Sequence, residues 1–164
     1  MSESTTDTVY SVDTSSMMDW QARYYPATVF LGLIQQMETL VGVGRIVAPA
    51  IVHDEIKAVG TTELITWAKA QAGLFVPMET VFSETQTIQS QYPGLRDPKA
   101  EYEEADAYVI ALAKIRGGFV VTEETPALAK KNPKRKYYIP DVCKGLGIPC
   151  ISLLGLMHRE QWTF

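Results

Sequence analysis

Cysteine is scarce in this sequence, which has only Cys143 and Cys150 among its 164 residues. Two cysteines are too few for a disulfide framework and lack the paired spacing of a zinc site, so we expect both to be reduced, small apolar side chains. Long apolar runs are also missing, since no stretch approaches the roughly 20 uncharged residues of a membrane span. The first nine residues, MSESTTDTV, lack the basic and apolar segments of a secretory signal. These absences predict a cytoplasmic protein that is not inserted in a membrane.

The sequence also lacks an excess of positive charge. It has 15 Lys and Arg against 19 Asp and Glu, a net charge of −4, which argues weakly against a protein that simply coats nucleic acid. The basic residues are unevenly spread, however, because KKNPKRK (residues 130–136) contains five of them. A solvated loop is the simplest interpretation of that segment alone.

VGVGR (residues 41–45) follows a helix and lacks the Gly-Lys-Ser/Thr of a phosphate loop, which makes a nucleotide-binding regulator the least favoured function.

Short apolar strands alternate with helical patterns along the sequence. We expect a flexible leader over residues 1–8 and one domain over residues 9–164, with a parallel β-sheet flanked by helices on both faces. The expected strands are residues 9–12, 45–49, 74–78, 119–122 and 148–153. The expected helices begin near residues 15, 26, 50, 62, 101, 139 and 153, the second of them with Pro26 in its first turn.

Acidic residues recur where the predicted strands end. Asp13 follows the first strand, and Glu123 and Glu124 follow the strand FVVT. Function collects beyond the carboxyl ends of strands in open α/β sheets, so these acids are candidate site residues. Asp13 has two interpretations at this point: a strand-end acid beside a helix capped by Ser15 or Ser16, or a metal ligand.

Two further acids belong to helices with apolar faces. Glu55 shares an i, i+4, i+8 stripe with Ile51 and Val59, and Asp106 lies three residues before Val109. A carboxylate among apolar side chains is costly unless it is paired or binds a cation, and no Lys or Arg lies at i±4 from Asp106. Several such carboxylates at one place would need a divalent cation, and an all-oxygen ligand set suits Mg²⁺ or Mn²⁺. Metal-assisted phosphodiester hydrolysis is the standard use of such a cluster.

Four segments together resemble the PIN-domain nucleases, in particular the VapC-like toxins of prokaryotic toxin–antitoxin pairs. They are YSVDTSS, APAIVHDEI, EADAYVIALAKIRGGFVVTEE and IPDVCKGLGIPCISL, and the resemblance extends from Val9 onward. It implies an α/β/α sandwich whose acids converge in one groove. It also implies a metal-dependent endoribonuclease that uses Mg²⁺ or Mn²⁺, cleaves RNA, is blocked by a cognate antitoxin protein and forms a homodimer.

The resemblance assigns the acids residue by residue. Asp13 matches the first acid, Glu55 the glutamate after the second strand, and Asp106 the acid that opens the long helix. The family's fourth acid is an Asp or Asn shortly after the strand-end Thr, where this sequence has Glu123 and Glu124, and we favour Glu124. Asp141 is either a further metal ligand or an acid at a helix N-terminus.

Hydroxyl and basic residues complete the implied site. The hydroxyls expected to hydrogen-bond the carboxylates or a water molecule are those of Thr14, Ser15, Ser16 and Thr122. The residues expected to hold the RNA backbone on the rim are Lys130, Lys131, Lys134, Arg135 and Lys136, with Tyr137 and Tyr138 stacking on bases. The glutamate pair at the fourth position keeps open an alternative, a catalytically weak PIN-like module that binds RNA or a protein without cleavage.

Overall fold

The computed structural model describes residues 7–71 and 73–164. It has one sheet of five parallel strands in the order β3-β2-β1-β4-β5, which confirms the predicted α/β fold. The strands are β1 (Tyr10–Val12), β2 (Ile46–Pro49), β3 (Phe75–Val76), β4 (Phe119–Val121) and β5 (Cys150–Ile151). A flexible leader is expected over residues 1–8, and residues 1–6 of it lie outside the described residues. The backbone carbonyl of Thr8 accepts a 2.9 Å hydrogen bond from Arg45 Nε.

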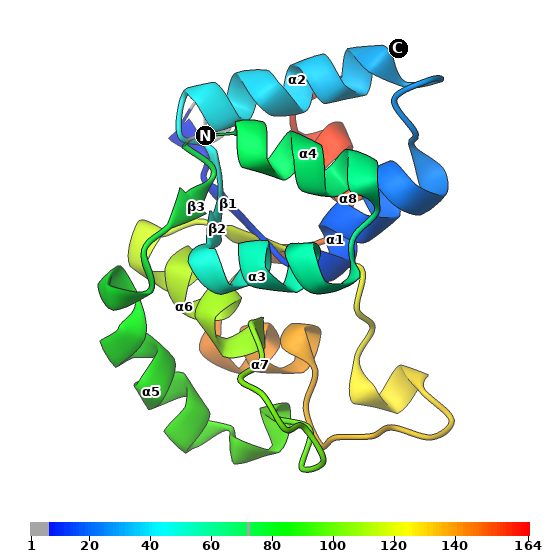
Figure 1. Cartoon of the computed structure of the whole chain (residues 1–164). Coiled ribbons are helices and arrows are strands. Elements are labelled where there is room, and N and C mark those ends of the chain that lie inside the picture. Colours follow the sequence, from blue (N-terminus) through cyan, green and yellow to red (C-terminus); the bar gives the residue numbers. More distant parts are fainter. Residues whose placement is uncertain (1–6, 72) are drawn as a thin grey trace.

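Helices cover both faces of the sheet, with α5, α6 and α7 on one face and α2, α4 and α8 on the other (Figure 1). The α-helices are α1 (Thr14–Met18), α2 (Leu31–Gly42), α3 (Ala50–Val59), α4 (Thr62–Ala70), α5 (Phe82–Gln91), α6 (Asp106–Arg116), α7 (Ile139–Leu146) and α8 (Leu153–Arg159). The shorter elements are the π-helical η2 (Asp19–Tyr24) and the 3₁₀ turns η3 (Met78–Thr80), η4 (Pro93–Leu95) and η5 (Ala127–Ala129). Within the described residues, every helix is too short or too polar to cross a membrane.

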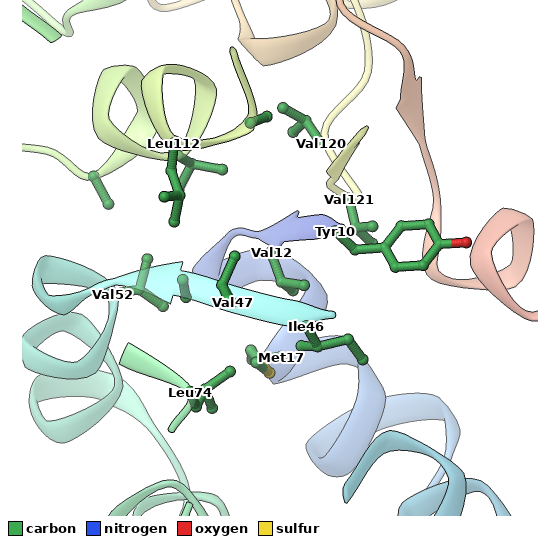
Figure 2. Close-up of a cluster of buried hydrophobic side chains, with 14 of the residues drawn as sticks. Tyr10, Val12, Met17, Ile46, Val47, Val52, Leu74, Leu112, Val120 and Val121 are labelled. Atoms are coloured by element: carbon green, nitrogen blue, oxygen red, sulfur yellow. The ribbon is translucent and has the colours of Figure 1, made fainter. Parts of the chain in front are cut away.

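The core lies between the sheet and its two helical layers. Figure 2 shows Leu112 of α6 pointing toward the sheet from one side, with Met17 and Ile46 on the other side. Alternation along β1 directs Tyr10 toward α8 (Figure 2). Its hydroxyl donates to Glu160, the residue that follows α8, at 2.6 Å. Ser11 faces the opposite way and donates to the Val109 carbonyl of α6 at 2.8 Å. This bond gives the buried Ser11 hydroxyl a hydrogen-bond partner and helps to hold α6 in position against β1.

Two predicted helices begin later than expected. Pro26 starts a turn in which the Val29 amide donates to the Pro26 carbonyl, and α2 begins only at Leu31, leaving Val29 71% exposed. The long helix expected from residue 101 begins at Asp106, because the polar residues before it form an irregular segment. It ends as predicted at Gly117, whose φ of 61° is the left-handed conformation that favours glycine at a helix end.

Candidate functional site

The fold brings three of the predicted acids to the same edge of the sheet. Asp13 directly follows β1, and Glu124 lies shortly after β4, which pairs with β1 in parallel so that both strands end together. The strand order reverses direction between β1 and β4, and this is where open α/β sheets form their binding crevice. Helix α6 returns across the sheet to β4, so its first residue, Asp106, starts from this same edge.

Asp13 is almost completely buried, with 4% of its surface exposed. Its carboxylate accepts hydrogen bonds from the Ser16 amide at 3.0 Å, the Ser15 hydroxyl at 2.9 Å and the Thr122 hydroxyl at 2.6 Å. Burial raises the pKa of Asp13 to about 6, an effect that these hydrogen bonds oppose and the nearby Glu124 charge reinforces. Asp13 is itself the N-cap of α1, so the expectation that Ser15 or Ser16 caps this helix is wrong. Asp13 is therefore a strand-end acid that itself caps α1, and its interpretation as a metal ligand stays a prediction.

Glu55 reaches the site from α3. Thr14 donates a short hydrogen bond to one carboxylate oxygen of Glu55, and the Ala105 amide donates to the other at 3.3 Å. These bonds tie α3 to the start of α1 and to the residue before α6. Burial raises the pKa of Glu55, while the Thr14 and Ala105 bonds oppose this rise and the charges of neighbouring carboxylates add to it.

The prediction that Ile51, Glu55 and Val59 form the apolar stripe of α3 is wrong. Glu55 nevertheless lies near the other acids. The buried positions are Val52 and Ile56, whereas Val59 is 66% exposed. Glu55 is therefore beside the buried face rather than within it, and its partners are polar.

Arg135 links Asp106 to Glu124. Its two terminal nitrogens lie 2.5 Å from an Asp106 oxygen and 2.7 Å from a Glu124 oxygen, and the first also lies 3.4 Å from Glu104. The Arg135 side chain is only 12% exposed and lies over the Tyr138 ring at 4.5 Å. Burial and the charge of Glu124 raise the pKa of Asp106, and the Arg135 guanidinium opposes that rise.

The segment of Arg135 was predicted to form the rim of an RNA groove, but the structure draws this side chain into the acid cluster. Tyr138 is 8% exposed and has Lys130 as well as Arg135 over its ring, at 4.4 Å for Lys130. Its face is therefore occupied, so the expected stacking of Tyr138 on a base is wrong. The exposed basic side chains of this segment are those of Lys131, Lys134 and Lys136.

Glu123 and Asp141 do not join the cluster. The Glu123 carboxylate accepts from the Leu153 amide at 2.8 Å, so it is directed to the first turn of α8. Asp141 accepts from the Tyr138 amide at 2.9 Å and the Ala127 amide at 3.0 Å, forming the capping box of α7. Of the predicted ligands, these two have structural partners elsewhere. The helix N-terminal interpretation of Asp141 is the one that its geometry supports.

The other four predicted acids, together with Glu104, form a group that we call the carboxylate cluster, and its net charge is negative. Its members are Asp13, Glu55, Glu104, Asp106 and Glu124, against one guanidinium. They lie close enough for their charges to raise one another's pKa values, as Glu124 does for Asp13, Glu55 and Asp106. A cluster with this excess of buried negative charge fits a hard divalent cation by charge and donor type. Over residues 7–71 and 73–164, however, no three Asp, Glu, His or Cys side chains converge closely enough to hold an ion.

A pocket of about 570 Å³ opens beside the cluster. It lies between η4, the end of α5 and the start of α6, and Glu104 and Asp106 form part of its wall. Aromatic and apolar walls come from Tyr92, Tyr102 and Leu95. A volume of this size is within the ordinary range of roughly 300–1,000 Å³ for small-molecule sites and can accept a nucleotide-sized group.

Residues 10–164 match the family described as a domain of unknown function, DUF4411. The chain belongs to this family. The match begins at the first residue of β1 and therefore includes every member of the carboxylate cluster and Arg135. No curated protein and no solved structure matches the chain.

The sequence interpretation missed Arg135 as an ion-pair partner and Glu104 as a cluster member. Glu104 lies two residues before Asp106 among other acids, in EYEEADA, where nothing separates it from a solvated charge. Arg135 is 29 residues from Asp106, so helical spacing could not reveal the pair. The only signal was indirect: an Arg, which forms bidentate carboxylate pairs, among four lysines.

Proposed function

We propose that the protein is a metal-dependent endoribonuclease in which Asp13, Glu55, Asp106 and Glu124 hold Mg²⁺ or Mn²⁺. The observation that supports this proposal is that four carboxylates from separate segments lie at the crevice between β1 and β4, near enough for the charge of Glu124 to raise the pKa values of the other three. Buried acids whose charges raise one another's pKa values are costly to keep for structure alone, and such groups cluster at functional sites. The RNA substrate is inferred from the sequence resemblance to PIN-domain nucleases.

The side chains around the acids have defined parts in this proposal. Thr122 and Ser15 orient the Asp13 carboxylate, and Thr14 orients Glu55, so the oxygens are held before a cation arrives. A bound divalent cation would supply an activated water and would stabilise the leaving oxygen. In this proposal, the pocket beside Asp106 binds a nucleotide that flanks the scissile phosphodiester. The exposed lysines of residues 130–136 would contact the RNA backbone.

Cleavage of a labelled, single-stranded RNA of mixed sequence tests the proposal. We expect cleavage with Mg²⁺ or Mn²⁺, none with EDTA, and a loss of at least a hundredfold in Asp106→Asn. Asp141→Asn is the matched control, because it removes the same charge from an acid that caps α7, and it should retain cleavage when the protein is folded. Equal cleavage in EDTA, or in Asp106→Asn, would exclude metal-dependent hydrolysis at this site.

One observation favours a second candidate function, a module that binds RNA or a protein partner without cleaving it. Arg135 holds oxygens of Asp106 and Glu124, and an arginine there neutralises part of the charge that would attract a cation. For this function we expect RNA to bind in EDTA as well as in Mg²⁺, with the RNA recovered intact in both. Cleavage that depends on the metal would exclude it.

We further propose that the nuclease acts in the cytoplasm as the toxin of a type II toxin–antitoxin pair. The resemblance to VapC-like toxins supports this proposal, and it implies a homodimer and an antitoxin that covers the acid edge. Induced expression in bacteria should arrest growth, expression of Asp106→Asn should not, and co-expression of an adjacent small reading frame should restore growth. Arrest by both variants would reject the toxin role, and size-exclusion chromatography would measure the oligomeric state.

A further inference from the structure

Arg135 has more partners than an ordinary surface arginine. One terminal nitrogen contacts Asp106, Glu104 and the Leu95 carbonyl, the last at 3.2 Å, and the other contacts Glu124. With the Tyr138 ring on one face, the guanidinium is enclosed by groups that suit a planar cation. These contacts come from four segments, which are η4, the two residues before α6 with its first turn, the chain after β4, and the start of α7.

Two of these partners are the acids that the proposed function assigns to a divalent cation. Magnesium binds carboxylate oxygens at about 2.0–2.1 Å, and it would then lie close to a guanidinium already 2.5 Å from Asp106. A magnesium ion and a guanidinium that contact the same carboxylate repel each other strongly in a half-buried site. In the structure, the Asp106 and Glu124 oxygens each face one terminal nitrogen of the guanidinium, so the ion pairs occupy oxygens that the cation would need.

We propose that Arg135 and a divalent cation compete for Asp106 and Glu124, so that metal binding requires the guanidinium to withdraw. This inference rests on the proposed function for the identity of the ligands. Arg135 then acts as a positioning residue: in the metal-free protein it holds two mutually repelling carboxylates at the crevice, and it releases them when the metal enters.

Arg135 lies in an irregular segment whose backbone is anchored to η4. Residues 130–136 contain neither helix nor strand, and this segment is part of the long excursion between β4 and α7, yellow to orange in Figure 1. The backbone is fixed nearby, because the Tyr137 amide donates to the Gly94 carbonyl at 3.0 Å. In this proposal, rotation about the side-chain torsions of Arg135 moves the guanidinium away from the acids while the main chain stays in place.

The competition makes a quantitative expectation for metal affinity. In the wild-type protein, part of the binding free energy of the cation is offset by the breaking of the Arg135 ion pairs. Removal of Arg135 should therefore tighten Mn²⁺ binding by at least tenfold. If Arg135 instead serves only to shape the metal site, its removal should weaken Mn²⁺ binding or leave it unchanged.

Isothermal titration calorimetry with Mn²⁺ alone, at neutral pH and without RNA, separates these results. The variants are Arg135→Gln and the matched control Lys134→Gln, which removes the same charge from the neighbouring exposed residue. We expect Arg135→Gln to bind Mn²⁺ at least tenfold more tightly than wild type, and Lys134→Gln to bind it within about twofold of wild type. Equal affinities in the two variants, weaker binding in Arg135→Gln, or no binding by any protein would overturn the inference.

Two additions keep the test decisive if Arg135→Gln does not fold. Arg135→Lys keeps the charge but not the planar guanidinium whose two nitrogens bridge Asp106 and Glu124, so it should also bind Mn²⁺ more tightly than wild type, and an unchanged affinity would count against the inference. In the wild-type protein, diamagnetic Mg²⁺ should shift the guanidinium NMR signals of Arg135, and signals that stay in place at saturation would overturn it.

The calorimetry and the cleavage assay fail independently. Tighter Mn²⁺ binding by Arg135→Gln without any RNA cleavage would support the competition and reject the nuclease. Metal-dependent cleavage together with unchanged Mn²⁺ affinity in Arg135→Gln would support the nuclease and reject the competition.

Discussion

The Thr122 hydroxyl donates a 2.6 Å hydrogen bond to the Asp13 carboxylate, and this bond joins the ends of two neighbouring strands. Both residues are 4% exposed, so the bond is made away from water. The same hydroxyl accepts from the Glu124 amide at 3.0 Å. Thr122 thus fixes two of the proposed ligands relative to each other, one through its carboxylate and one through its backbone.

Thr122→Val should destabilise the protein by roughly 1–3 kcal/mol, because it keeps the side-chain shape and leaves a buried carboxylate short of a donor. Urea denaturation measures this change. The control is a double-mutant cycle with Asp13→Asn, in which the cost of Thr122→Val should shrink because its charged partner is gone. Costs that simply add would mean that Thr122 stabilises the fold independently of Asp13.

Stability should depend on pH through Asp13. Its pKa is about 6 in the folded protein against 3.8 for an unperturbed aspartate, so between these values the folded state binds more protons than the unfolded state. The free energy of unfolding therefore falls as pH rises through this window, by up to about 3 kcal/mol from this one group. Glu55 and Asp106, whose pKa values are also raised, contribute in the same direction.

Urea denaturation of wild type and Asp13→Asn at intervals between pH 4 and pH 7 checks this prediction. The slope of the free energy of unfolding against pH should be shallower in Asp13→Asn, whatever the absolute stability of the variant. Equal slopes in the two proteins would show that Asp13 is not a titrating group of the fold in this range.

The sequence predicted the sheet because strand and helix patterns are local, and a parallel sheet brings strand-end acids together by topology alone. Asp13 could be placed at the crevice by that reasoning, without knowledge of a single contact. Arg135 could not, because its place depends on a long excursion of the chain that packs against η4 and Tyr138. Local pattern also misassigned the buried face of α3, since Val59 lies near the helix end where it is exposed.

The adjacent glutamates show a further limit of sequence reasoning. Glu123 and Glu124 are neighbours in the chain, so their side chains point in different directions. The sequence alone does not decide which of the two faces the crevice. The structure directs Glu124 to Arg135 and Glu123 to the first turn of α8. The difference arises from the amides that each carboxylate meets, Ile139 for Glu124 and Leu153 for Glu123.

This divergence provides a matched pair of variants. Glu124→Gln should reduce metal-dependent RNA cleavage by at least a hundredfold, because it removes charge from the carboxylate cluster. Glu123→Gln should keep cleavage within a few fold and lower stability by about 0.5–1 kcal/mol, since its carboxylate serves the N-terminus of α8. Cleavage rates and urea denaturation, measured on both variants, check the assignment. The opposite pattern of rates would make Glu123 the fourth acid.

The exposed lysines beside Arg135 should bind RNA through its phosphates. Lys131→Gln and Lys134→Gln together should weaken binding of single-stranded RNA and reduce the slope of log affinity against log salt by about 0.7 for each phosphate that is no longer neutralised. Fluorescence anisotropy across a salt series measures both quantities, in Ca²⁺ or EDTA so that the RNA stays intact. The control is Lys57→Gln with Lys69→Gln, which removes equal charge from α3 and α4. If the control lowers the slope as much as the test pair does, net charge alone explains the effect, and residues 130–136 have no particular place in RNA binding.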